Sequence, residues 1–234
     1  DNVIALKVDS RESINVPPFG FVIDYMTYGG VYRDVYIDIK EKSHIEDVFV
    51  KTKIKTGGLD SATICEVTVA NPLEGSTIKQ YLRKCTSIEE ATDENEDTKN
   101  HLMFKELETK TTVSESVNNY SITQFTDRIE LWDIDNPNLY EIKTVLFDKN
   151  GEKLDEKTVR FGYRKAVFHK DGFYLNGKRV KIRGLNRHQS YAYTGYAMPE
   201  SMQKLDADIL KNELGLNAVR TSHYPQSHHF IDRC

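Results

Sequence analysis

The sequence has few cysteines, no long apolar run and no excess of positive charge. Its three cysteines, Cys65, Cys85 and Cys234, are odd in number and widely spaced along 234 residues, which fits neither a disulfide framework nor a zinc site. No apolar run approaches the roughly 20 residues that a membrane-spanning helix needs. A formal net charge of −4 supplies no positive surface for nucleic acid or an anionic membrane. We therefore expect no bound metal and neither of these two partners.

Apolar and aromatic residues, in contrast, are sufficient for globular cores. Hydrophobic residues make up 38% of the chain, and 13 Tyr and 10 Phe supply most of its aromatic content. The length exceeds that of one ordinary domain and falls short of three complete ones. Asp1, rather than a methionine, begins the sequence and directly precedes an alternating apolar stretch. We expect an internal piece of a longer protein.

Residues 1–40 show the period-two alternation that predicts β-strands. Apolar side chains alternate over residues 3–8 and again over residues 31–39, where the chain enters through Gly29-Gly30. So few strands cannot close a core alone. This segment is therefore interpreted as the end of a larger β-domain.

Residues 41–162 contain several short alternating runs separated by turn residues. Such runs occur at 48–54 and 65–69, and a hairpin is predicted between 140–147 and 158–161 because Asn150-Gly151 lies between them. This pattern favours an antiparallel sandwich of immunoglobulin-like size. The acidic run at 88–100 is interpreted as a solvated loop.

Residues 163–234 follow a different pattern. A hairpin is predicted around Asn176-Gly177, and apolar residues at helical spacing over 202–214 predict a helix with Pro199 in its first turn and Gly215 just past its end. A strand over 216–220 follows, so the order is strand, helix, strand. Such a βαβ unit implies parallel pairing. The pattern alone leaves an α/β barrel and an open sheet as alternatives.

Polar residues are densest where the strands of this βαβ unit end. The first cluster is Asn186-Arg187-His188, and the second lies in the stretch 217–225, which ends at Pro225. Clusters at the carboxyl ends of parallel strands are typical of α/β-barrel sites. The spacing of His223, His228 and His229 matches no usual metal motif. We expect a ligand rich in hydroxyl groups.

The stretch 217–225, followed after four residues by Phe230-Ile231, resembles the signature of glycoside hydrolase family 2. This family includes β-galactosidases, β-glucuronidases and β-mannosidases. Blocks at 28–35, 131–140 and 161–188 resemble other parts of the family in the same order. The resemblance implies a mainly β chain: the end of a jelly-roll sugar-binding domain (1–40), an immunoglobulin-like β-sandwich (41–162) and the truncated start of a (β/α)8 TIM barrel (163–234).

The resemblance also implies a retaining β-glycosidase as the longer protein. Such an enzyme uses two carboxyl groups about 5 Å apart, and in this family both glutamates lie on later barrel strands. No acidic residue of this chain is therefore expected to be a catalyst, and the chain alone is expected to be inactive. The favoured substrate is a terminal β-galactoside. The alternatives are a β-glucuronidase, suggested by Gln189 where many relatives have an acidic residue, and a carbohydrate-binding module without catalysis.

Four residues of this chain match sugar-site residues of the family. The resemblance implies that His188 and His223 contact sugar hydroxyls, although each also fits a loop histidine that caps a carbonyl. It places Arg220 near the catalytic carboxylates, where a guanidinium holds a nucleophilic glutamate ionised; the alternative is an ion pair inside the barrel. Asp24 matches an aspartate that reaches from the jelly roll to sugar hydroxyls and a sodium ion, or is an ordinary turn aspartate.

Further properties of the longer protein follow only from the resemblance. We expect it to bind Mg and Na ions, whereas this chain is expected to hold no cofactor. A β-linked oligosaccharide or glycoside is the expected partner, together with further copies of the protein in a homo-oligomer. A cytoplasmic location is favoured.

Overall fold

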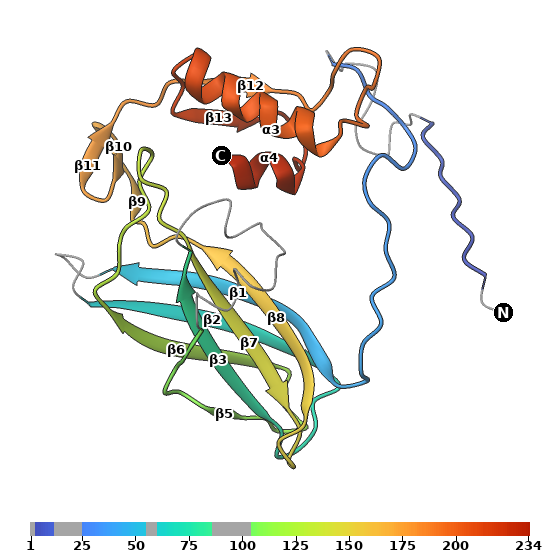
Figure 1. The fold of residues 1–234 in the computed structure, drawn as a ribbon, viewed down its shortest axis with the longest axis vertical. Coiled ribbons are helices and arrows are strands. Elements are labelled where there is room, and N and C mark those ends of the chain that lie inside the picture. Colours follow the sequence, from blue (N-terminus) through green and yellow to red (C-terminus); the bar gives the residue numbers. More distant parts are fainter. Residues whose placement is uncertain (1–2, 12–24, 55–59, 86–103) are drawn as a thin grey trace. The chain divides into compact units, whose positions relative to one another are not determined.

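The computed structural model describes residues 3–11, 25–54, 60–85 and 104–234, and most of the regular structure is β. The chain divides into two compact units, each shown in Figure 1. One unit is Asp38–Lys181. The other combines Asp1–Ile37 with Ile182–Cys234. Among the described residues, no helix has both the length and the apolar character required to cross a membrane.

The Asp38–Lys181 unit contains two antiparallel sheets. The first sheet has the order β1-β2-β6, formed by His44–Ile54, Asp60–Ala70 and Asn119–Asp127. The second has the order β4-β3-β7-β8, with β5 also paired to β3; these strands are Lys105–Glu106, Thr77–Lys84, Tyr140–Phe147, Lys153–Phe161 and Thr111–Thr112. The predicted strands at 48–54 and 65–69 and the predicted hairpin across Asn150-Gly151 are all confirmed.

The inward-facing residues of both sheets form a single aliphatic core. Its buried members from the first sheet are Ile45, Val48, Cys65, Val67, Val69 and Ile122, and those from the second are Ile78, Leu82, Ile142 and Leu146. Every second residue of a strand faces inward, which produces this sandwich from alternating sequence. The predicted sandwich architecture is confirmed.

Tyr163 closes one end of this core. Its side chain is 0% exposed, packs edge-on against Tyr140 and Phe161, and its hydroxyl lies 2.6 Å from the Thr63 hydroxyl. Burial raises the pKa of Tyr163 above its usual value. The carbonyl of Tyr163 accepts a hydrogen bond from the backbone N–H of Trp132. The aromatic side chain and its backbone thus join β8 to the loop that precedes β7.

A small three-stranded sheet completes the same unit. Its strands are β9 (Ala166–His169), β10 (Gly172–Leu175) and β11 (Lys178–Val180), in the order β11-β10-β9. The predicted turn at Asn176-Gly177 is confirmed, with positive φ angles of 51° and 81°. The Asn176 amide donates to the Trp132 carbonyl at 2.9 Å. This contact joins the sheet to the sandwich.

The second unit contains the predicted βαβ element. Strand β12 (Gly184–Arg187) pairs in parallel with β13 (Ala218–Thr221), and the chain between them forms α3 (Glu200–Asp208) and a π-helical turn, η1 (Ile209–Glu213). A short helix, α4 (His228–Arg233), follows β13. Gly184 is required where the strands meet, since a Cβ there would lie 2.6 Å from the Ala218 carbonyl oxygen. Parallel pairing is confirmed.

Two predictions of local structure are wrong. Residues 3–11 and 31–39 form no strand, and Ile4, Leu6, Tyr36 and Ile39 are each at least two-thirds exposed. An isolated strand leaves its backbone groups and apolar side chains without partners, and the described residues provide no strand that pairs with either segment. Within the described residues, the apolar side chains of these two segments are therefore not buried in a core.

The buried face of α3 also differs from the predicted one. Gln203 and Ala207 are its buried residues, whereas Leu205 is about half exposed. The reason is the polar contact that Gln203 makes with the buried Arg187 side chain. The acidic run at 88–100 and the candidate residue Asp24 lie outside the described residues.

The three cysteines, all among the described residues, form no disulfide bond. Cys65 and Cys85 are buried and Cys234 is exposed. Burial raises the pKa of Cys65 to about 11. A thiol with this pKa is inert near neutral pH, so Cys65 serves as a small core side chain.

Substitution of Tyr163 by Phe tests the closure of the sandwich. We expect a loss of about 1–3 kcal/mol in the free energy of unfolding, because the Thr63 hydroxyl is left buried without its partner. Urea unfolding followed by fluorescence of Trp132, the single tryptophan, reports on this unit. The double variant with Thr63→Val is the control and should lose less than the sum of the two single variants. Strict additivity would contradict the direct hydroxyl contact.

Candidate functional site

Two histidines meet at the carboxyl ends of the parallel strands. His188 directly follows β12 and His223 lies two residues beyond β13. The register pairs Arg187 with Thr221, which brings both strand ends to the same edge. The imidazole centroids lie 5.4 Å apart with an interplanar angle of 77°. The structure thus brings together the two polar clusters that the sequence singled out.

The imidazoles have hydrogen-bonding capacity that the described residues do not use. The Nδ1 atom of His188 is buried and has no hydrogen-bond partner among the described residues. His223 is exposed and follows a cis Ser222–His223 peptide bond. A neutral imidazole donates from one nitrogen and accepts at the other. The pair can therefore bind a ligand that offers both donors and acceptors, such as adjacent sugar hydroxyls.

Tyrosines surround these histidines on one side. The Tyr25 ring centroid lies 5.0 Å from that of His188 and 5.7 Å from that of His223, and Tyr224 lies 6.1 Å from Tyr25. The Tyr224 hydroxyl accepts the backbone N–H of Gln189 at 2.8 Å. Neither Tyr25 nor Tyr224 is among the candidate site residues that the sequence predicts. In the sequence, only the position of Tyr25 next to the candidate residue Asp24 could have indicated that Tyr25 belongs to the site.

Tyr196 links this cluster to the segment around Tyr25. Its buried ring lies 5.2 Å from the Tyr224 ring, and its hydroxyl donates to the Met26 carbonyl at 2.7 Å. Burial, and then a hydrogen bond with Tyr224, raises the pKa of Tyr196. Tyr28 packs edge-on against Tyr196 at 4.7 Å. The hydroxyl remains protonated at neutral pH and can keep donating to Met26.

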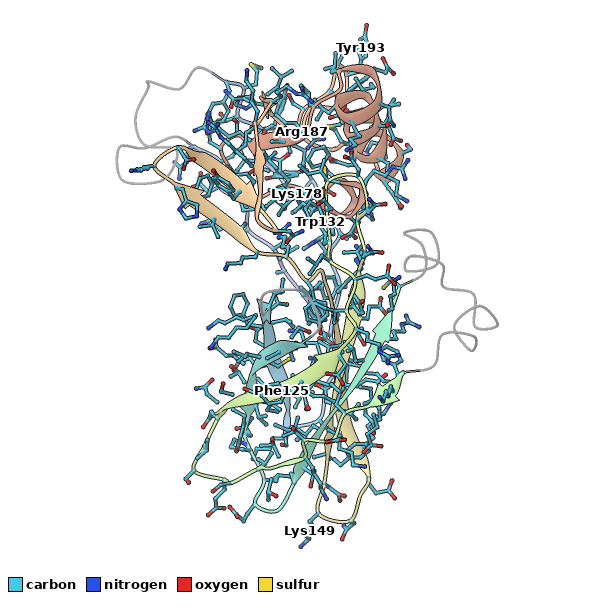
Figure 2. All side chains as sticks on the ribbon, turned by 90° about the vertical axis from the view of Figure 1, so that its left-hand side faces the viewer. Phe125, Trp132, Lys149, Lys178, Arg187 and Tyr193 are labelled. Atoms are coloured by element: carbon cyan, nitrogen blue, oxygen red, sulfur yellow. The ribbon has the colours of Figure 1, made fainter. Side chains whose placement is uncertain are left out.

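Arg187 forms a buried polar network behind the histidines. Its guanidinium donates to the Asp206 carboxylate at 2.7 and 3.0 Å, to Gln203 at 2.8 Å and to Gln226. The guanidinium also lies 3.9 Å from the centroid of the Phe230 ring. Arg187 is 5% exposed and is labelled within the side chains of its unit in Figure 2. It thus joins β12, α3, α4 and the segment after His223.

Gln189 has a structural role in the described residues. The side chain is 1% exposed, and its Oε1 accepts the backbone N–H of Ser227 at 2.6 Å. An acidic residue at this position would place a charge in the same buried contact. The buried hydrogen bond therefore accounts for a glutamine at position 189 without any contact between Gln189 and a bound ligand.

Arg220 is exposed and only loosely held. Its Nη1 lies 3.5 Å from both the Asn186 Oδ1 and the Ser222 Oγ, at the outer limit for a hydrogen bond. Within the described ranges no carboxylate forms an ion pair with Arg220. The expected alternative of an ion pair inside the barrel is thus not seen there. The guanidinium is free to pair with an anionic group.

Metal-binding residues do not gather in the described residues. No group of three or more His, Cys, Asp or Glu side chains there has the arrangement of a metal site. His229 lies on α4, and its Nδ1 is 3.8 Å from the Glu200 carboxylate. Asp24, the candidate sodium ligand, is not among these residues. The described residues therefore add no cluster of metal ligands to the candidate site.

Comparison with known proteins matches both parts of this architecture to a single family. Residues 43–164 match the sequence model described as "Glycosyl hydrolases family 2". Residues 167–234 match "Glycosyl hydrolases family 2, TIM barrel domain". The chain belongs to glycosyl hydrolase family 2. The sandwich and the β12–α3–β13 element are therefore the family's sandwich domain and the start of its TIM barrel.

Relatives with two different names align over the whole chain. A beta-galactosidase from Thermoanaerobacterium thermosulfurigenes is 44% identical and one from Rhizobium meliloti is 35% identical, with 31% and 29% of those proteins covered. A putative beta-glucuronidase from Formosa agariphila is 30% identical, with 26% of its length covered. The chain thus spans less than a third of each of these relatives.

Solved structures of known enzymes share the fold. A beta-glucuronidase from Parabacteroides merdae has a TM-score of 0.76 at 22% identity, over 97% of this chain and 26% of that one. A Bacteroides uniformis beta-glucuronidase has a TM-score of 0.73 at 25% identity, over 97% of this chain and 26% of that one. The fold of this chain is therefore shared with these two beta-glucuronidases.

Substitution of Arg187 by Ala tests the network behind the site. We expect it to lower the local stability of β12 and β13 by about 3 kcal/mol, the lower end of the range for a broken buried ion pair, because Asp206 keeps some solvent contact. Hydrogen exchange of the strand amides measures this change. Arg233→Ala is the matched control, since Arg233 pairs with Asp208 in an exposed bridge; it should cost less than about 1 kcal/mol. Equal effects would contradict the special role of Arg187.

Proposed function

We propose that this chain is the central part of a retaining β-glycosidase that hydrolyses terminal β-galactosides. The observation that carries the proposal is the His188–His223 pair at the carboxyl ends of two parallel barrel strands. Family membership supports the reaction class. The beta-galactosidases at 35–44% identity over the whole chain support the galactoside.

In this proposal the two imidazoles bind sugar hydroxyls. The unpartnered Nδ1 of His188 and the exposed ring of His223 supply the donors and acceptors for them. Arg220 pairs with a catalytic carboxylate and favours its ionised form. Asp24, which precedes Tyr25 in the sequence, supplies a further carboxylate toward the sugar.

The two catalytic carboxyl groups are proposed to come from residues outside these 234. Retention of configuration requires two such groups about 5 Å apart on either side of the glycosidic bond. Two parallel strands and one crossover do not enclose an eight-stranded barrel. The chain alone therefore binds sugar weakly at most and does not cleave it. The metal ions expected for the longer protein take no part in this proposal. The homo-oligomer expected of the longer protein stays a prediction.

A β-glucuronidase is the second candidate. The Formosa agariphila relative carries that name, and Arg220 is an exposed cation that suits a substrate carboxylate. The same guanidinium cannot both pair with a catalytic glutamate and provide full recognition of a glucuronate. The two candidates therefore predict different substrate preferences.

Substrate preference separates these candidates. We expect the longer protein to hydrolyse an aryl β-galactoside with a kcat/KM at least about tenfold above that for the aryl β-glucuronide, since a site that leaves a substrate carboxylate unpaired discriminates by more than about 1.4 kcal/mol. The 234-residue chain should show no turnover in the same assay. A glucuronide preference would overturn the galactoside assignment, and turnover by the short chain would overturn the placement of the catalytic carboxyls.

Substitution of His188 by Ala tests the sugar contact. In the longer protein we expect kcat/KM to fall about 10- to 100-fold, because a lost hydrogen bond to the sugar costs about 1–3 kcal/mol. His229→Ala is the matched control: its ring lies on α4 beside Glu200 and should leave kcat/KM nearly unchanged. Similar losses in both variants would argue against a specific contact at His188.

A further inference from the structure

We propose that Tyr25 is a positioning residue that holds both imidazoles of the site in their binding orientation; this inference rests on the proposed function. Its ring forms a closed triangle with the rings of His188 and His223. The three centroid distances are 5.0, 5.7 and 5.4 Å. Each ring of the triangle therefore contacts the other two.

The geometry restricts a motion that imidazoles otherwise make easily. The χ2 torsion of histidine is broad, so an imidazole without neighbours samples many ring orientations. Tyr25 meets His188 at 37° and His223 at 49°, and tilted contacts of this kind stabilise particular ring orientations. Without Tyr25, each imidazole would keep only one partner of the triangle. Both rings would then rotate more freely, and their nitrogens would be less well directed toward a sugar.

Contacts of the neighbouring residues with Tyr196 fix the backbone next to Tyr25. The carbonyl of the next residue, Met26, accepts the hydroxyl of the buried Tyr196 at 2.7 Å. Tyr28 and Tyr32 pack edge-on against the same Tyr196 ring at 4.7 and 5.3 Å. A side chain that positions others must have a fixed backbone, and these contacts provide one.

Tyr25 lies outside the residues that the two family matches cover. Those matches span 43–164 and 167–234. The candidate site therefore includes an aromatic residue from a segment that neither of these two matches covers. The contacts observed between Tyr25 and these two histidines are ring contacts. Phenylalanine should thus replace tyrosine here, whereas alanine should not.

Histidine modification in the 234-residue chain tests this proposal without any assay of hydrolysis. Diethyl pyrocarbonate is the probe, and mass spectrometry follows each histidine separately. We expect Tyr25→Ala to raise the modification rates of His188 and His223 by about threefold or more, because both rings lose a packing partner. Tyr25→Phe should stay within about twofold of the unsubstituted chain, since it keeps the ring. His44 and His169, which belong to the other compact unit, are internal references.

The matched control is Tyr193→Ala. Tyr193 is 107% exposed, lies at the edge of its unit in Figure 2 and should leave all rates unchanged. Hydrogen exchange of β12 and β13 shows whether each variant keeps its fold. If the Tyr25→Ala variant loses protection from exchange in these strands, the Tyr25→Leu variant is used in its place, because leucine retains apolar bulk but not the ring. Unchanged rates at both site histidines, or a rise that extends equally to His44 and His169, would overturn the proposal.

Kinetics of the longer enzyme separate positioning from stability. We expect Tyr25→Ala to lower kcat about tenfold or more with KM within about threefold, because misdirected imidazoles lose the hydrogen bonds that strengthen in the transition state. Rates are divided by the number of active sites titrated with a covalent inactivator, so a loss of folded enzyme cannot mimic the effect. A fall in active-site number alone, or equal losses in Tyr25→Phe, would overturn the positioning role. If the longer protein has no glycosidase activity, the proposed function fails while the modification result still tests the ring triangle.

Discussion

The parallel register of β12 and β13 is the constraint on which the site depends. Since Asn186 pairs with Arg220 and Arg187 with Thr221, both strands deliver their next residues to the same edge. Successive side chains of a strand point to opposite faces. Arg187 therefore reaches the helices, where Asp206 and Gln203 receive it, while His188 turns toward His223. One register thus places a supporting network on one face and the candidate binding groups on the other.

Different kinds of interaction stabilise the two compact units. The sandwich has an aliphatic core between two sheets, in which Cys65 acts as one more small apolar residue. The other unit has few buried aliphatic residues and relies on the Arg187 guanidinium and on tyrosines. Buried charges and hydroxyls need partners in definite directions, whereas aliphatic contacts do not. Such directional contacts suit a region that must hold particular ring nitrogens in place.

Much of the fold was predictable because it follows from local pattern. The structure confirms the predicted strands of the sandwich, the turns at Asn150-Gly151 and Asn176-Gly177 and the βαβ order. The failed strand predictions at residues 3–8 and 31–39 share one cause. Alternation predicts that a segment can be a strand, but a strand forms only where another strand satisfies its backbone. The buried face of α3 differs from the predicted one for a related reason, since the partner of Gln203 is an arginine from strand β12.

The sequence by itself determined the family, the sandwich and the two histidines that follow neighbouring strands, because each depends on short-range periodicity or on a recognisable run of residues. Only the tertiary structure decided that Tyr25 joins those histidines and that Arg187 is buried behind them. Tyr25 is separated from His188 by most of the chain, and no local pattern encodes a contact between such distant segments. The ring triangle exists because the fold brings residues 182–234 and the segment that contains Tyr25 into one compact unit.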